Sequence, residues 1–307
     1  MVASRDDDTL QIYNTNQGKH AKELKSHKYG VHLARFSHHF QSIIYASTKV
    51  DDAIRFLSTH DDSFIRYFKG HTDTVTSIAL CPSSDTFISC AKDNTVRLWD
   101  LQSPHFQGQL NLHGAYLAAY DPSASVIAIA SPSTHHVLLY DIRNYDKPPF
   151  ANFDLQDMEQ RFLGPQGGDW TKMEFTNDGK SLVVATTGRG HFVLDAFTGE
   201  ITHFCYRKAG HSGRLGPTET APSTKGVRGQ GDVAVTPDGQ YLIGGSGEEG
   251  LLSWDISKAP SADHYLHPVT LNSPTKTAVV GYNPKYNMLA TGDKDIVLWQ
   301  PDPDIML

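Results

Sequence analysis

Short stretches of apolar residues, each ending in a bulky residue and often an aspartate, recur along the chain. The ending Val96-Arg97-Leu98-Trp99-Asp100 has six counterparts: Leu10–Asn14, Ile54–Ser58, Val137–Asp141, Phe192–Asp195, Leu251–Asp255 and Ile296–Gln300. Short apolar or alternating runs bounded by turn residues are typical of β-strands. The seven endings therefore predict seven copies of one strand-rich unit.

The copies follow one another at nearly regular intervals. The counterparts of Trp99 are residues 13, 57, 140, 194, 254 and 299, which gives intervals of 44, 42, 41, 54, 60 and 45 residues. A period of about 40–45 residues is typical of WD repeats, each of which forms one blade of a propeller. The sequence predicts an all-β, seven-bladed WD-repeat β-propeller, in a single domain over residues 1–307. The two long intervals predict insertions near residues 145–170 and 207–231.

The first copy is incomplete. Met1 to Asn14 aligns with Ser89 to Asp100, so the first blade is expected to lack its two inner strands. We interpret this as truncation of a longer product, because an incomplete blade leaves open strand edges that proteins usually protect. The alternative is that the last blade closes differently. A partner segment that fills the gap would stabilise the fold.

The stretch Gly70–Asp100 is the most complete copy and contains a structural tetrad. His71 precedes its first strand, Ser89 lies in the second, Asp93 in the following turn and Trp99 in the third. A hydrogen-bond chain from the Trp99 ring through Ser89 and His71 to Asp93 would tie the strands together. A hydrolase triad uses the same residue types, but the spacing is that of the repeat, so we predict no catalytic residues.

Composition narrows the class of protein. The chain has 27 basic and 34 acidic residues, a net charge of −7 and a pI near 6.1, which argue against direct nucleic-acid binding. Its three cysteines fit neither a disulfide framework nor a zinc ribbon, and favour a reducing compartment. We expect an intracellular protein with no membrane segment, no metal and no cofactor.

Other motifs have plainer explanations. Gly245–Gly250 matches a phosphate-binding glycine pattern, but a strand-like run follows where a helix is required, so it is interpreted as a turn. The pairs His38-His39 and His135-His136 are interpreted as solvated turn residues, because neighbouring strand residues point to opposite faces. The stretches predicted to face the channel are apolar, for example Val75–Leu80, which disfavours an enzyme.

Candidate partner-binding residues lie at blade ends and turns. Arginines at these positions could form a groove for an acidic peptide, and the turns between second and third strands carry charges of both signs, which suits a protein ligand. The set is Lys28, Tyr29, Asp51, Asp52, Arg55, Arg66, Arg97 and Arg143. Tyr140–Arg143 also resembles the ending by which some WD-repeat proteins dock onto a ubiquitin-ligase adaptor.

Several segments resemble the Swd-two family of WD-repeat proteins over most of Lys28 to Trp299. They are Lys28–Val31, Asp51–Ser58, Phe64–His71, Asp85–Ser89, Lys147–Ala151, Asp195–Phe197 and Asn283–Lys285. That family is the subunit shared by the COMPASS histone H3 lysine 4 methyltransferase complex and, in fungi, the mRNA cleavage and polyadenylation machinery with its associated phosphatase. The animal counterpart joins a nuclear phosphatase complex.

The resemblance implies a nuclear, non-catalytic scaffold, monomeric within larger complexes and involved in histone methylation, mRNA 3′-end processing and transcription termination. The implied partners are the N-terminal region of a SET-domain histone methyltransferase and a subunit of the cleavage/polyadenylation-associated phosphatase complex. The alternative is a substrate receptor of a ubiquitin ligase.

Overall fold

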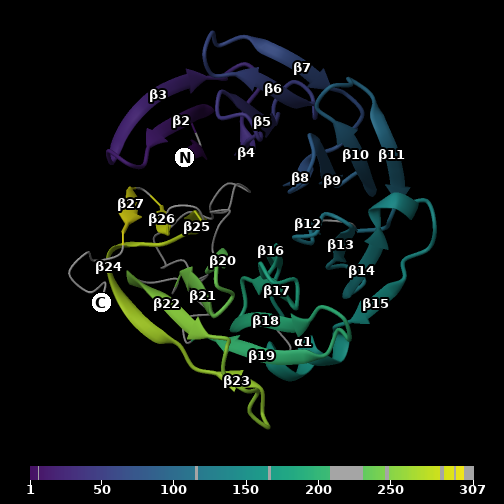
Figure 1. Cartoon of the computed structure of the whole chain (residues 1–307), viewed down its shortest axis with the longest axis vertical. Coiled ribbons are helices and arrows are strands. Elements are labelled where there is room, and N and C mark those ends of the chain that lie inside the picture. The colour runs from purple at the N-terminus through teal and green to yellow at the C-terminus, as the bar shows by residue number, and fades with distance from the viewer. Residues whose placement is uncertain are drawn as a thin grey trace, which may run out of the picture. The chain divides into compact units, whose positions relative to one another are not determined.

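The chain folds into seven sheets, the blades of a seven-bladed WD-repeat β-propeller, which confirms the predicted all-β class (Figure 1). The computed structural model describes residues 1–5, 7–114, 117–164, 167–207, 231–245, 249–283, 287–293 and 295–300. Two compact units, Met1–Asn152 and Phe153–Leu307, each have their own core. The single domain expected from the sequence stays a prediction.

Unit 1 holds the first three sheets and most of the fourth. The first sheet comprises β1 (Val2–Ser4), β2 (Thr9–Asn14) and β3 (Lys19–Lys25), and the second β4 (His32–Phe36), β5 (Ser42–Ala46), β6 (Ile54–Ser58) and β7 (Phe64–Phe68). The third comprises β8 (Val75–Leu80), β9 (Thr86–Ala91), β10 (Thr95–Asp100) and β11 (Phe106–Asn111). The fourth comprises β12 (Leu117–Tyr120), β13 (Val126–Ser131), β14 (His136–Asp141) and β15 (Ala151–Asp154), with the short helix η1 (Ile142–Asn144) after β14.

Burial along the strands explains their places in the sheets. The second strand of a blade is mostly apolar and buried, as in β5, where all five residues, including Ser42, are buried. An outer strand alternates instead. In β7, Ile65 and Tyr67 are exposed whereas Phe68 is buried, which is the period of two expected when only one face is covered.

The core of unit 1 lies between adjacent sheets. Trp99 packs against Phe68 of the preceding sheet and against Phe87 of its own sheet, with ring centroids 5.6 and 6.1 Å apart. A second cluster joins the third and fourth sheets through Ile88, Val96 and Ile129. Burial of these apolar side chains is the main force that holds the sheets together.

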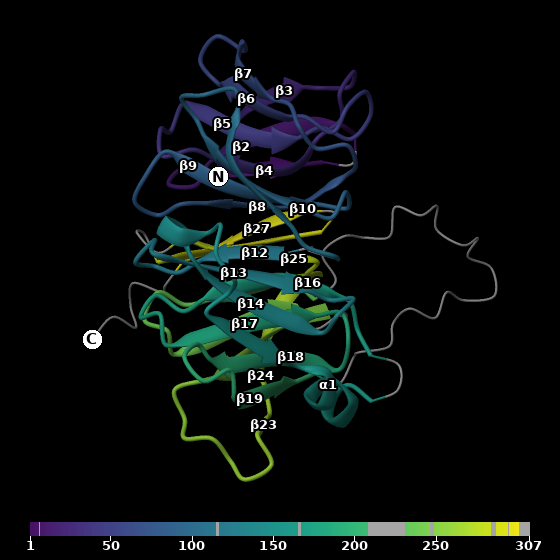
Figure 2. The same cartoon turned by 90° about the vertical axis from the view of Figure 1, so that its right-hand side faces the viewer.

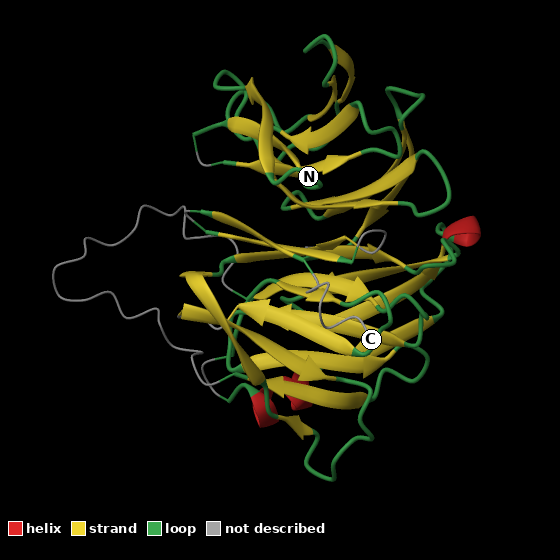
Figure 3. Cartoon of the chain, turned by 60° about the vertical axis from the view of Figure 1, so that its left-hand side comes forward, coloured by secondary structure: helices red, strands yellow, loops and turns green. Residues whose placement is uncertain are grey.

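Unit 2 holds the remaining three sheets. The fifth comprises β16 (Trp170–Phe175), β17 (Ser181–Thr186), β18 (Gly190–Asp195), β19 (Ile201–Tyr206) and β23 (Tyr265–Leu266). The sixth comprises β20 (Val233–Val235), β21 (Tyr241–Gly245), β22 (Glu249–Asp255) and β24 (Val269–Lys276), and the seventh β25 (Val279–Asn283), β26 (Met288–Gly292) and β27 (Ile296–Trp299). Strands dominate the described chain, as Figure 3 shows.

Two features of unit 2 were not foreseen. Helix α1 (Gln156–Phe162) lies beside the outer strands of the fifth sheet (Figure 2), where Phe162 stacks on Phe204 with centroids 4.9 Å apart. Strand β23, formed by residues between β22 and β24, pairs in parallel with β19 and widens the fifth sheet to five strands. Tyr265 of β23 also contacts Phe162, so the helix and the added strand share one aromatic cluster.

The structure refines the predicted blade boundaries. The first sheet has three strands among the described residues, because β1 takes the place of a second strand and pairs with β2 from Val2↔Ile12 to Ser4↔Leu10. The prediction that both inner strands are lacking was therefore wrong for one of them. The insertion near 145–170 holds β15 and α1, whereas residues 208–230 of the other insertion lie outside the described residues.

Candidate functional site

The structure brings the four tetrad residues together in the third sheet. The Trp99 Nε1–H donates to Ser89 Oγ over 2.8 Å, and Ser89 Oγ lies 2.6 Å from His71 Nε2. His71 Nδ1 lies 3.0 Å from Asp93 Oδ2. A carboxylate only accepts, so Nδ1 carries the proton and the Ser89 hydroxyl donates to Nε2. One chain of donors and acceptors thus joins β10 to β9, to the turn before β8 and to the turn after β9.

Burial and hydrogen bonds shift the pKa values of His71 and Asp93. Desolvation lowers the pKa of His71 below its ordinary value, despite the opposing hydrogen bond and charge of Asp93. Burial would raise the pKa of Asp93, but hydrogen bonds from Thr95, His71 and the Thr72 amide lower it overall. Ser89 is fully buried, so its hydroxyl is closed to a substrate. The geometry is that of an internal tie between strands.

Arg55 forms a different tie in the second sheet. It stands two residues before Leu57, as Arg97 stands two before Trp99. Its Nη2 donates to both carboxylate oxygens of Asp51 at 2.8 and 2.9 Å, and its Nε donates to Ser47 Oγ at 2.7 Å. The guanidinium also lies 3.6 Å from the ring centroid of Tyr29. Since Arg55 is 2% exposed, we assign it a structural role.

Arg97 lacks the equivalent partners. Asp93, four residues before it, is bound by His71 and Thr95, and the Nε and Nη1 atoms of Arg97 are buried without a hydrogen-bond partner. The guanidinium stacks over Phe106 at 4.8 Å and covers Gly70, and burial lowers its pKa. Arg97 is therefore also closed to an acidic peptide.

The other predicted binding residues differ in accessibility. Arg66 Nη1 donates to the Leu101 carbonyl of the next sheet. Lys28 is exposed, with its Nζ 5.1 Å from the Tyr29 ring, and Arg143 is exposed in η1, apart from this cluster. Asp52 is half-buried, and burial, followed by the charges of Asp73, Asp51 and Asp93, raises its pKa. Asp51, Asp52, Asp73 and Asp93 therefore form one acidic patch.

Parts of the turns predicted between second and third strands lie outside the described residues. They include Asp6, Lys294 and residues 246–248 of the glycine pattern. Within the described ranges, no group of three histidine, cysteine, aspartate or glutamate side chains could hold a metal ion. No helix among the residues placed by the structure is long and apolar enough to cross a membrane.

Two further tryptophan ties escaped the sequence analysis. In the seventh sheet the Trp299 Nε1–H donates to Thr291 Oγ1 at 3.0 Å, and Thr291 follows Leu289 by two residues as Ser89 follows Phe87. In the sixth sheet the Trp254 Nε1–H donates instead to a backbone oxygen, the Tyr206 carbonyl, at 3.0 Å. A search for serine or threonine at this position, and not for serine alone, would have found the hydrogen bond between Trp299 and Thr291.

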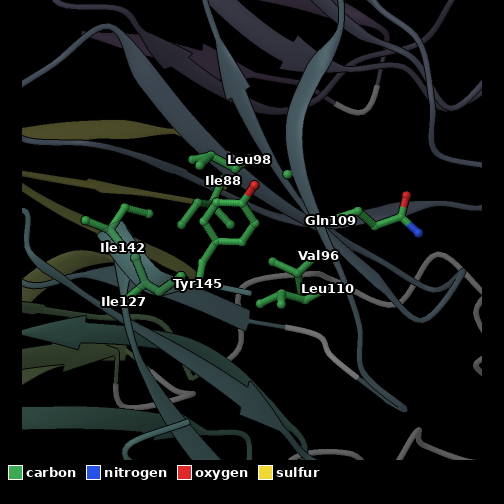
Figure 4. A pocket seen from close by; sticks show the side chains of 9 residues that line it. Ile88, Val96, Leu98, Gln109, Leu110, Ile127, Ile142 and Tyr145 are labelled. Carbon is green, nitrogen blue, oxygen red and sulfur yellow. The ribbon is translucent and has the colours of Figure 1, made fainter. Parts of the chain in front are cut away.

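A small hollow between the third and fourth sheets is closed by a tyrosine. Figure 4 shows the Tyr145 ring among Ile88, Ile127 and Ile142. The hollow that these residues line has a volume of about 10 Å³, the size of a single water. The Tyr145 hydroxyl donates to the Gln107 carbonyl at 3.0 Å, and its ring lies directly over Gly108. This hollow is too small for a ligand.

Comparison with known proteins shows close relatives along almost the whole chain. The family "WD domain, G-beta repeat" matches residues 62–100, which include the tetrad. The chain is 35% identical to WD repeat-containing protein 82 of Drosophila melanogaster, over 98% of this chain and 86% of that protein. It is 33% identical to Set1 complex component swd2 of Schizosaccharomyces pombe, over 97% and 88%, and 30% identical to COMPASS component SWD2 of Saccharomyces cerevisiae, over 96% and 85%.

Proposed function

Because the chain belongs to the Swd-two family of WD-repeat proteins, we propose that it is a non-catalytic adaptor subunit of a nuclear histone H3 lysine 4 methyltransferase complex of the COMPASS type. The observation that carries the proposal is the 30–33% identity, over nearly the full chain, to components of the Set1 and COMPASS complexes. A likeness of this extent spans most of both units.

The geometry supports an adaptor. The serine, histidine and aspartate of the third sheet are hydrogen-bonded to one another inside the blade, and Ser89 is fully buried. Rigid blades with variable loops are suited to holding extended segments of larger subunits. The finer part of the proposal is that the main partner is the N-terminal region of a SET-domain histone methyltransferase. A second assembly, with the cleavage/polyadenylation machinery and its phosphatase, is the corresponding proposal for mRNA 3′-end processing and transcription termination.

The candidate partner-binding residues fall into an accessible group and a buried group. We assign partner contacts to Lys28 and Arg143, which are exposed, and to Asp52, which is half-buried. Arg55 and Arg97 are buried, and Arg66 bonds the Leu101 carbonyl, so these three arginines serve the fold. Tyr29 and Asp51 both contact Arg55 and belong with it.

Direct binding tests the proposal. The purified full chain is mixed with the N-terminal region of the SET-domain methyltransferase from the same organism, and complex formation is followed by size-exclusion chromatography and calorimetry. A stable one-to-one complex is expected. Absence of binding, while the chain binds the phosphatase-complex subunit, would remove the methyltransferase partner and leave the second assembly.

A further inference from the structure

The seventh sheet ends at the strand that carries Trp299. In the other six sheets an outer strand follows at this point, and these strands are β3, β7, β11, β15, β19 and β24. Among the described residues, β27 pairs with β26 on one edge and with no strand on the other (Figure 1). That open edge presents backbone N–H and C=O groups of the kind that an outer strand satisfies in the other sheets.

The side chains of β27 are less buried than their counterparts in other sheets. Trp99 of β10 and Trp254 of β22 are 0% exposed, whereas Trp299 is half-buried. Ile296 is half-buried too, although its counterpart Val96 is only 2% exposed. All four residues of β27 are apolar and none carries a charge. An uncharged, apolar strand edge is a typical place for the addition of another strand.

Unit 2 already contains one outer edge that takes up a strand from elsewhere in the chain. Strand β23 joins the outer edge of β19, in the fifth sheet, although it lies between β22 and β24 in the sequence. The Phe204 amide donates to the His264 carbonyl at 2.7 Å, and the Tyr265 ring contacts the Phe204 ring with centroids 5.5 Å apart. Backbone hydrogen bonds and an aromatic contact thus hold the added strand.

The outer strands of the second, third and fifth sheets share one pattern, which shows what would fit on β27. An apolar residue lies opposite the position of Trp299, and a second lies opposite the position of Ile296. A β-bulge between them makes the two residues four apart in sequence and turns them to opposite faces of the sheet. The three pairs are Phe64 and Phe68, Phe106 and Leu110, and Ile201 and Cys205.

We propose that the open edge of β27 binds an extended segment of a partner protein as the fourth strand of the seventh sheet. The segment runs antiparallel to β27, with apolar residues at positions i and i+4 opposite Trp299 and Ile296. Backbone hydrogen bonds to the edge supply affinity, and the two apolar side chains supply selectivity. The inference rests on the proposed function only in taking the occupant to be a segment of a partner.

A second copy of this chain does not offer the required pattern through its own β27. The pattern spans five residues, whereas β27 has four. Gln300 follows Ile296 by four positions, and Asp295 precedes Trp299 by four, so neither has an apolar residue at the required spacing. The three segments that do carry the pattern are already paired in their own sheets. We therefore assign the edge to a different protein.

The first test uses a capped peptide with the sequence of residues 63–69, because that sequence contains both apolar residues at the required spacing. The peptide is titrated into the full-length chain, and amide hydrogen exchange is followed by mass spectrometry. At saturation, exchange within Ile296–Trp299 should slow by at least about tenfold. Exchange that slows at another strand edge and not at β27, or that slows nowhere, would overturn the proposal.

Two variant peptides provide the matched comparison, and neither requires a change in the protein. One carries Phe64→Ser and Phe68→Ser, which remove the two pattern residues, and it should bind at least about tenfold more weakly, a change of 1.4 kcal/mol. The other carries Ile65→Ser and Tyr67→Ser, at positions that are exposed in β7, and it should bind as the unchanged peptide does. Equal binding by the two variant peptides would contradict the proposed pattern.

A second arm separates this inference from the proposed function. The N-terminal region of the SET-domain methyltransferase is bound to the full-length chain, and the peptides are added as competitors. Displacement by the unchanged peptide, and not by the Phe64→Ser, Phe68→Ser peptide, would place the methyltransferase segment on β27. If the peptide and the methyltransferase region bind at the same time, the adaptor function stands and the proposed occupant is wrong. If the peptide binds and the methyltransferase region does not, the edge stands and the assigned partner is wrong.

Discussion

At the scale of single residues, the second and third sheets of unit 1 link their strands through different hydrogen bonds. In the third sheet, His71 Nδ1–H donates to Asp93, and His71 Nε2 accepts from the Ser89 hydroxyl. In the second sheet, Arg55 donates to Ser47 and Asp51, and its guanidinium lies over the Tyr29 ring. Each arrangement pairs the buried polar groups that belong to it, each of which would cost about 1–3 kcal/mol if left unpaired.

Replacement of Ser89 by alanine tests the tetrad. The variant leaves the Trp99 Nε1–H and His71 Nε2 buried without their partner, so the free energy of unfolding should fall by about 1–3 kcal/mol. Urea denaturation measures it, with the exposed Ser84→Ala in the same sheet as control. A loss no larger than that of the control would show that the tetrad contributes nothing to stability.

The two arginines should respond differently to methionine. Arg55→Met removes three hydrogen bonds, two of them to a carboxylate, and we expect a loss of about 2 kcal/mol, the middle of the range for bonds to charged groups. Arg97→Met removes a guanidinium whose Nε and Nη1 have no partner, so its cost should be smaller. Thermal unfolding of both variants measures the two losses of stability. An Arg97→Met variant as unstable as Arg55→Met would contradict the assigned roles.

Buried His191 should make stability depend on pH. Burial, and then the charge of Arg207, lower its pKa well below 6.5. As pH falls below 6.5, the unfolded chain binds the proton first, so stability is complete above that pH and is lost towards the lower folded-state pKa, by up to about 1.4 kcal/mol per pH unit.

The variant His191→Asn isolates this contribution. Asparagine keeps an acceptor for the Thr186 amide, which donates to His191 Nδ1 at 3.1 Å, but it does not titrate. The slope of unfolding free energy between pH 7 and 5.5 should be shallower in this variant, and unchanged in the exposed control His60→Asn. Equal slopes in all three proteins would rule out His191 as a source of the pH dependence.

At the scale of elements, the outer strands are fixed by what covers them. Gly108 in β11 lies under the Tyr145 ring, and a Cβ atom there would come within 2.4 Å of it. Gly108→Ala should therefore displace Tyr145 and cost about 1–3 kcal/mol, the usual range for overpacking. The control is Gly281→Ala in β25, where a Cβ atom meets nothing within 4 Å.

A double variant confirms the cause. In a chain that already carries Tyr145→Ala, the Gly108→Ala change should cost little, because the ring that it meets is gone. Additive losses in the double variant would mean that Gly108 is required for another reason.

Local elements were predictable from the sequence, and distant pairings were not. The tetrad was found because its residues lie within one repeat, Gly70–Asp100, at the spacing of that repeat. The role of Arg55 was missed, because the sequence does not show that Asp51 turns back onto it. Strand β23 pairs with β19 across some sixty residues, without alternation long enough to mark it. Helix α1 is seven residues long, too short for a clear helical period.

At the scale of the whole molecule, the chain is a propeller protein of the Swd-two family, and we propose that it holds segments of other proteins. The Ser89, His71 and Asp93 side chains are bound to one another inside the third sheet. The exposed residues Lys28 and Arg143 are the proposed contacts. The 33% identity to the Set1 complex component of fission yeast extends over 97% of the chain, which is the main support for this function.

The most direct measurement is affinity purification of the tagged, full-length protein from nuclear extract, read by mass spectrometry. The account predicts recovery of histone H3 lysine 4 methyltransferase subunits, together with subunits of the cleavage/polyadenylation or phosphatase machinery. Recovery of ubiquitin-ligase adaptors alone, with no methyltransferase subunit, would contradict the proposed function and leave only the fold and family.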